Sequence, residues 1–149
     1  MADFAPSRST EGDADMRAAL ETPQASDTDK ACLRLGLRGL GEGTAGDARA
    51  GISACMRQIR SAHENGAAQT ARASRLRDHS LRVAGAMRAA GADASIVDQH
   101  MHADLGDKAQ EARVTAEAFY RVKAGLRAAL VALVGVLITD AFCDSLPGA

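Results

Sequence analysis

Two histidines and two aspartates alternate along a short stretch of the chain, at Asp98, His100, His102 and Asp104. Imidazole nitrogens and carboxylate oxygens are common ligands of Zn²⁺ and related ions. On a β-strand, side chains two residues apart point to one face, so all four could hold a single metal. In a helix, residues two apart point about 200° away from each other. The neighbouring residues have a helical period, so we expect two solvated histidines and no metal site.

The string from Ile96 to Asp104 also resembles local metal motifs of two enzyme families. One is the amidohydrolase superfamily, whose first barrel strand ends in H-x-H, and the other is the metallo-β-lactamase fold, with H-x-H-x-D-H. The resemblance implies a metal held by His100 and His102. It covers fewer than ten residues, and Leu105 stands where the second family has its last histidine. Only 45 residues follow Asp104, and both folds need far more chain. We therefore expect a protein that is not an enzyme, with no catalytic residue, metal or cofactor.

Three glycines, Gly41, Gly43 and Gly46, match the pattern G-x-G-x-x-G. In dinucleotide-binding folds this pattern follows a strand and holds phosphate at a helix N-terminus. Leucines at 33, 35 and 37 do alternate with other residues in a strand-like period. No second strand and no βαβ repeat follows, however. Residues 31–50 are therefore expected to form a glycine-rich linker and not a nucleotide site.

Charge is distributed in blocks, although the net charge of −1 indicates no partner. Residues 1–30 carry seven acids against three bases, residues 51–90 seven arginines against two acids, and residues 91–118 six acids against two bases. A basic helix can contact the phosphates of nucleic acid. There are no aromatic residues beside these arginines to stack on bases. We expect the basic helix to lie beside the acidic helices, and a nucleic-acid accessory role is kept as an alternative.

The N-terminal residues are acidic and polar. Residues 1–30 contain Pro6, Pro23 and no sustained apolar period, which predicts a disordered acidic tail. They lack the basic start and apolar run of a secretory signal peptide. The three cysteines, at 32, 55 and 143, are odd in number and form no CxxC pair, so we expect reduced thiols in the cytoplasm. Export by a route that reads a disordered N-terminus stays open, as does membrane association.

From Asp47, the expected N-cap, the apolar spacing is helical. One helix is expected up to Gly66, with Ile52, Met56 and Ile59 on one face. A second is expected over residues 67–90, with Leu76, Val83 and Met87 on one face and Gly91 as its C′ residue. Ser95 and Asp98 fit a capping box that opens a short helix carrying Val97, Met101 and Leu105, which Gly106 closes. The last helix is expected to begin at Asp107 and to fray near Cys143.

The last helix has the strongest signal. Its large apolar residues recur three or four positions apart, at Phe119, Val122, Leu126, Leu130, Leu133 and Leu137. Between Ala128 and Ile138 it is apolar on every face, so it must be buried in a bundle, a partner or a membrane. The twelve uncharged residues between Arg127 and Asp140 span about 18 Å, against a hydrocarbon thickness of about 30 Å. Burial in protein is therefore preferred, and a membrane anchor over residues 124–143 is the alternative.

The composition completes the prediction of the fold. The chain is alanine-rich, and aromatic residues make up 3% of its 149 residues, with no Trp. Such a core suits closely packed helices. We predict an all-α protein: a disordered tail over 1–30, a linker over 31–50 and a small bundle of three or four helices over 51–149. The apolar stripes are thin for a free-standing core. We therefore expect a non-catalytic interaction or assembly protein, in which Phe119, Val122, Leu126, Leu130, Leu133 and Leu137 bind a protein partner or a second copy.

Overall fold

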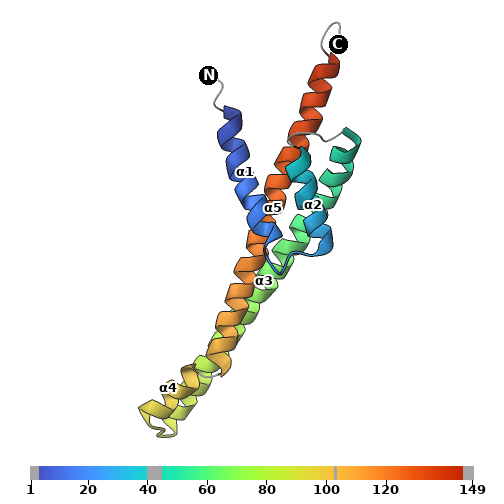
Figure 1. Cartoon of the computed structure of the whole chain (residues 1–149). Coiled ribbons are helices and arrows are strands. Elements are labelled where there is room, and N and C mark those ends of the chain that lie inside the picture. Colours follow the sequence, from blue (N-terminus) through green and yellow to red (C-terminus); the bar gives the residue numbers. More distant parts are fainter. Residues whose placement is uncertain (1–3, 40–44, 103, 146–149) are drawn as a thin grey trace. The chain divides into compact units, whose positions relative to one another are not determined.

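The computed structural model describes residues 4–39, 45–102 and 104–145 (Figure 1). Five helices occupy this part of the chain: α1 (Phe4–Leu20), α2 (Asp27–Gly39), α3 (Ala45–Ala89), α4 (Ala94–His102) and α5 (Asp104–Ser145). No strand occurs within the described residues. The predicted all-α bundle is confirmed.

The chain forms two compact units. The first comprises Met1–His63 and Ala118–Ala149, and the second comprises Glu64–Glu117. Both α3 and α5 therefore contribute residues to each unit.

The first unit includes a helix where a disordered tail was expected, which corrects that prediction for residues 11–30. Met16 and Ala19 of α1 are fully buried, whereas the acidic residues Glu11 and Asp15 remain exposed. After the helix ends, the hydroxyl of Thr22 donates a 2.9 Å hydrogen bond to the carbonyl of Ala18. The sequence does not predict this helix, because its buried face is narrow, consists largely of small side chains and lies among many acidic residues.

The strand-like period at residues 33–37 is a second correction, because these residues belong to α2. A capping box opens this helix: the Ser26 amide donates to Asp29 Oδ2 at 2.9 Å, and the Asp29 amide donates to Ser26 Oγ at 3.0 Å. The leucines alternate because α2 is covered on more than one side. Leu33 lies close to Gly125 of α5, whereas Leu35 lies close to Gly51 of α3.

The core of the first unit joins four helices, which lie side by side in Figure 1. Its fully buried large side chains are Met16 from α1, Leu33 from α2, Cys55 from α3, and Val122, Leu126 and Leu133 from α5. Glycines permit close approach here, since a Cβ on Gly36 of α2 would lie 2.6 Å from the Cβ of Ala129 of α5. The chain therefore supplies its own cover for one face of α5.

Helix α3 is continuous, so the break expected at Gly66 does not occur. Twelve of its non-exposed positions follow one another in alternating steps of four and three residues: Ala48, Ile52, Cys55, Ile59, Ala62, Gly66, Gln69, Ala73, Leu76, Ser80, Val83 and Met87. We call this set the α3 seam, and its mean step of 3.5 residues is the repeat of a coiled coil. Gly66 lies in the seam as a buried residue. Met56, expected on this face, is 59% exposed, and Cys55 takes its place.

Helix α5 carries a matching α5 seam, again in steps of three and four with no exposed member: Ala109, Ala112, Ala116, Phe119, Lys123, Leu126, Leu130, Leu133 and Leu137. In the second unit the buried members of both seams are small, with Ala73 and Ser80 from α3 and the three alanines from α5. Val97 of α4 is the large side chain buried with them among the described residues. Small side chains allow helix axes to approach to about 8 Å, so close packing takes the place of a bulky core.

In the second unit, the end of α3 agrees with the sequence prediction, whereas the start of α4 differs from it. Gly91 has φ +84° and is the C′ residue of α3, as predicted. The Ala92 amide bonds to Met87 O and the Gly91 amide to Arg88 O, both at 3.0 Å, which is the Schellman pattern. Helix α4 begins at Ala94, one residue before Ser95, so Ser95 and Asp98 do not form the predicted capping box. The amides of Ile96 and Val97 instead donate hydrogen bonds to the carbonyl oxygen of Asp93.

The start of α5 is also corrected, because the helix begins at Asp104 and not at Asp107. Gly106, expected to close the preceding helix, lies inside the first turn of α5. A Cβ at this position would collide with the carbonyl oxygen of Met101 in α4. Gly106 therefore permits the tight approach of two successive helices.

Candidate functional site

The six residues expected to bind a partner divide between two environments. Val122, Leu126 and Leu133 are buried in the core of the first unit. Phe119, Leu130 and Leu137 are half-buried, and Leu130 packs against the same core. All six lie on the side of α5 that its own chain covers, so the fully buried three are closed to a partner in this fold.

The opposite side of α5 carries a second series, apolar except for one arginine, that the spacing of the large apolar residues does not predict. We call it the outer stripe, and it consists of Tyr120, Ala124, Arg127, Val131, Val134, Ile138 and Ala141. Every member is exposed, with Val131 at 59% and Ile138 at 63%. The steps are again four and three residues, the spacing that suits contact with another helix. Its signal in the sequence is the run that is apolar on every face.

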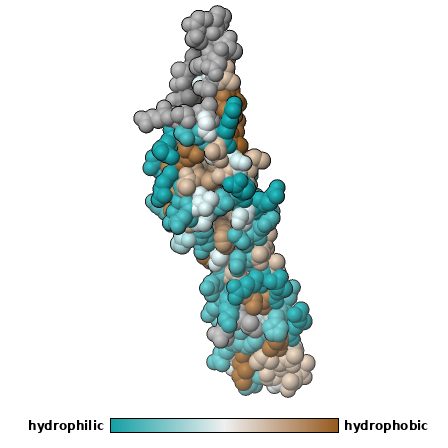
Figure 2. All heavy atoms as spheres, turned by 90° about the vertical axis from the view of Figure 1, so that its right-hand side faces the viewer, coloured by the Kyte–Doolittle hydropathy of each residue, from teal (hydrophilic) through white to brown (hydrophobic). Residues whose placement is uncertain are grey.

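Most of the visible surface is hydrophilic, with hydrophobic areas that are small and separate (Figure 2). Single exposed apolar residues are common on soluble proteins and need no explanation. Three β-branched residues in register along one helix are a different case, because Val131, Val134 and Ile138 form one continuous line. This line is the strongest candidate for a functional surface in the first unit.

One helical span in the described residues, Ala94–Thr139, is long and apolar enough to cross a membrane by length and composition, with a mean hydropathy of 1.9 in its most apolar window. One third of that window is buried inside the fold. The core helix of a soluble bundle has the same properties. This finding keeps the anchor hypothesis open without favouring it.

A polar cluster interrupts the α5 seam beside the outer stripe. The ammonium of Lys123 lies 3.1 Å from Nδ1 of His63 on α3. Since an ammonium group can only donate, Nδ1 accepts this bond and the ring proton belongs on Nε2. The ring of Tyr120 lies 6.2 Å from the His63 ring at a tilt of 56°. A lysine at a seam position specifies the register of two helices, so we assign this cluster a positioning role in the first unit.

The residues whose spacing resembles a metal motif do not share one face of one element. Asp98, His100 and His102 lie on α4, where successive members diverge, and Asp104 belongs to the next helix. Among the described residues, no group of three or more His, Cys, Asp or Glu side chains could hold a metal ion. Of the glycine motif, Gly41 and Gly43 lie outside the described residues, and Gly46 lies in the first turn of α3.

Two cysteines meet in the core of the first unit. Cys32 of α2 and Cys55 of α3 are buried, free thiols that hydrogen-bond to each other. Burial raises the pKa of Cys55 from 9.0 to about 12, and the neighbouring Cys32 adds to the rise. Burial also raises the pKa of Cys32, against a smaller lowering by its bond to Cys55. The thiolate is the reactive form, so this pair is chemically inert in the folded protein.

This burial predicts a loss of stability in alkali. Unfolding returns Cys55 to a pKa near 9.0, so between pH 9 and pH 12 the unfolded chain ionises while the folded thiol keeps its proton. We expect the free energy of unfolding to fall more steeply over this range in the natural protein than in a Cys55→Ala variant. Urea titrations at pH 8, 9, 10 and 11 measure both slopes. Equal slopes would contradict the assignment.

No protein-family model, curated protein or solved structure matches this chain. The outer stripe of α5 is the most extended exposed apolar line described above in the first unit.

Proposed function

We propose that this chain is a non-catalytic assembly protein whose α5 outer stripe pairs with the same stripe of a second copy. The observation that carries the proposal is the line of Val131, Val134 and Ile138, exposed on a helix whose other side already fills a core. Covering such a line removes apolar surface from water, at roughly 25 cal/mol per Å². Another helix is the cover that the coiled-coil spacing fits.

A second copy suits the stripe because an antiparallel pair is self-complementary, as a two-fold interface must be. With the two-fold axis between positions 131 and 134, Val131 lies level with Val134 of the other copy. Ala124 then lies level with Ala141, and Arg127 lies level with Ile138. The small residues at both ends allow the two helices to approach closely, and the aliphatic part of Arg127 can cover Ile138.

Charge also favours the antiparallel arrangement. A parallel pair would bring the two Arg127 guanidinium groups together, because each would occupy the same level. In the antiparallel pair they are eleven residues apart along the axis, or about 16 Å at 1.5 Å per residue. That separation exceeds the Debye length of about 8 Å at physiological ionic strength, so their repulsion is screened.

The proposed association is weak. Three large side chains are fewer than those of a standard interface, which buries about 800 Å² on each partner. We expect the average mass in sedimentation equilibrium to rise from 15.4 kDa at micromolar protein toward twice that value as the concentration increases. A Val131→Lys/Ile138→Lys double variant should stay monomeric, because it places four lysines in the contact.

The matched control is Leu81→Lys, which changes an exposed leucine of the second unit, 46% exposed, in the same way. It should associate like the natural protein. A natural protein that is monomeric at every concentration overturns the proposal, and so does a double variant that associates equally well.

The membrane anchor is the second candidate, supported by the apolar span that includes α5. Insertion would take Leu126 and Leu133 away from the core they fill with α1, α2 and α3, which costs the fold its largest contacts. Flotation of the full-length protein with phosphatidylcholine vesicles separates the two candidates. Protein that floats with neutral vesicles at high salt would favour the anchor.

A further inference from the structure

A group of basic side chains follows one face of α3 in the second unit. Arg72, Arg75, His79 and Arg82 are spaced three, four and three residues apart, so they share one side of the helix. All four are exposed. The same side of α3 thus presents three permanent positive charges over about 15 Å of helix.

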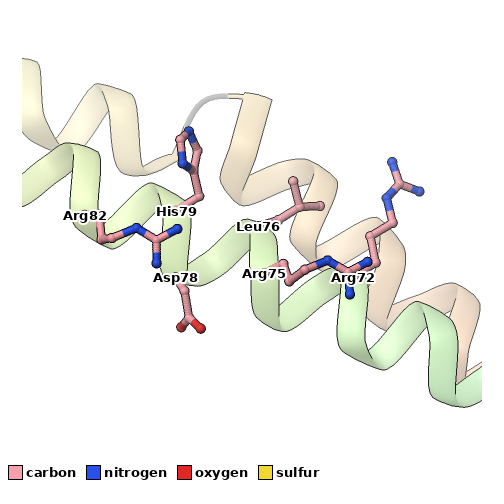
Figure 3. Close-up of a pocket in the computed structure, with 6 residues that line it drawn as sticks. All are labelled: Arg72, Arg75, Leu76, Asp78, His79 and Arg82. Carbon is pink, nitrogen blue, oxygen red and sulfur yellow. The ribbon is translucent and has the colours of Figure 1, made fainter.

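These side chains border a hollow of about 380 Å³. Its lining among the described residues is completed by Leu76 and Asp78. Figure 3 shows Arg72, Leu76 and His79 pointing to the same side of α3, toward the neighbouring helix, whereas the carboxylate of Asp78 points the opposite way. Because Asp78, the one acid in this lining, points away, the side of the hollow that faces Arg72 and His79 is basic.

The arginines have no acidic partner in the part of the chain that the structure describes. The sequence predicts that the basic helix lies beside the acidic helices. Within the described residues, however, Arg72, Arg75 and Arg82 make no ion pair or hydrogen bond. Asp78 is three residues from Arg75 and four from Arg82, yet it pairs with neither. Their donors are free to bind an external anion.

The chemistry of the lining selects the class of ligand. Guanidinium groups bind phosphate through two parallel hydrogen bonds, a geometry that lysine cannot reproduce. The volume lies in the range of small-molecule sites, about 300–1,000 Å³. No Phe, Tyr or Trp lines the hollow among the described residues, where the imidazole of His79 is the one aromatic ring. Recognition therefore depends mainly on charge and on forked hydrogen bonds.

We propose that this hollow beside α3 binds a compact polyanion with at least two phosphoryl groups, held by Arg72, Arg75 and Arg82. The site is independent of the outer stripe of α5, because it lies in the other unit. Arg72 and Arg75 are about one turn apart and can bridge adjacent phosphoryl groups of one ligand, whereas Arg82 lies about two turns beyond Arg75 and reaches a more distant group. A single sulfate or phosphate engages fewer of them and binds more weakly.

Calorimetric titration of the full-length protein with inorganic tripolyphosphate tests the site. We expect saturable binding that weakens between 50 and 200 mM NaCl, and at least tenfold weaker binding of sulfate at equal ionic strength. Arg72→Gln and Arg75→Gln should each weaken tripolyphosphate binding by about tenfold or more, the usual effect of losing a charged hydrogen bond. Thermal unfolding followed by circular dichroism checks that the variants fold.

Arg77→Gln is the matched control, since Arg77 is an exposed arginine of the same helix that does not line the hollow. It should change the affinity by less than about twofold, a change that diffuse electrostatics explains. Equal losses in Arg72→Gln and Arg77→Gln would overturn the proposal, because net charge alone would then explain binding. Undetectable binding of tripolyphosphate would also overturn it. So would tighter binding of a single-stranded RNA oligonucleotide than of tripolyphosphate, if Arg77→Gln weakened the RNA binding as much as Arg72→Gln did.

Discussion

Replacing either Leu126 or Leu133 by alanine is expected to lower the free energy of unfolding by about 2–5 kcal/mol. Both side chains are fully buried where α5 meets the other helices of the first unit. Each substitution removes three carbon atoms from contact and leaves a cavity that rigid helices close only in part. Urea titration monitored by circular dichroism measures the loss.

Leu81→Ala is the control for these variants, because it makes the same chemical change at a side chain that is 46% exposed on α3. We expect its effect to stay within about 0.5 kcal/mol, as for most surface substitutions. A loss of unfolding free energy at Leu126 or Leu133 no larger than at Leu81 would mean that the α5 seam is not buried within the chain. The outer stripe could then no longer be distinguished as the exposed side of α5.

Adding one methyl group at Gly36 or at Gly125 is expected to destabilise the protein by about 1–3 kcal/mol. A Cβ at Gly36 would lie 2.7 Å from the Cα of Ala129, and one at Gly125 would lie 2.9 Å from the carbonyl oxygen of Asp15. Backbone atoms cannot turn away as flexible side chains do, so whole helices must separate. The loss outweighs the gain of about 1 kcal/mol that alanine normally brings to a helix.

Gly85→Ala and Gly135→Ala provide the opposite expectation. Neither position has an atom within 4 Å of the added Cβ, and both lie inside helices. Alanine should therefore stabilise the protein there by up to about 1 kcal/mol. Thermal unfolding of all four variants compares the two pairs. Destabilisation at Gly85 as large as at Gly36 would show that helix packing is not the cause.

The sequence predicts the features of this fold that depend on large apolar residues or on special backbone angles. The long last helix follows from its leucines and valines, and the end of α3 follows from Gly91, whose positive φ disfavours any other residue. The all-α class follows from the wealth of alanine and the scarcity of rings.

The missed features are those in which small side chains make the contacts. Helix α1 presents Ala19 and Met16 to the core, too little apolar area to be recognised beside seven acids in the first thirty residues. The leucines of α2 mimic a strand because two helices cover different sides of it. The capping box of Ser26 and Asp29 was the signal that could have identified this helix.

The sequence predicts the candidate surface only in outline. It contains a segment that is apolar on every face, but hydropathy alone does not show which side of that helix the same chain covers. Glycines at 36, 51 and 125 decide this, because they let α1, α2 and α3 approach α5 from one side. The spacing of the residues on a contact face can therefore be read from the sequence, whereas the helix or chain that covers this face is decided by packing.

The alanine contacts of the second unit also bear on how its stability responds to temperature. The heat capacity of unfolding grows with the apolar area that water gains. Methyl groups such as those of Ala73, Ala84, Ala109, Ala112 and Ala116 expose little area when the helices separate. The free energy of this unit therefore varies along a shallow curve, so warming and cooling weaken it more gradually than they weaken a domain with a bulky interior.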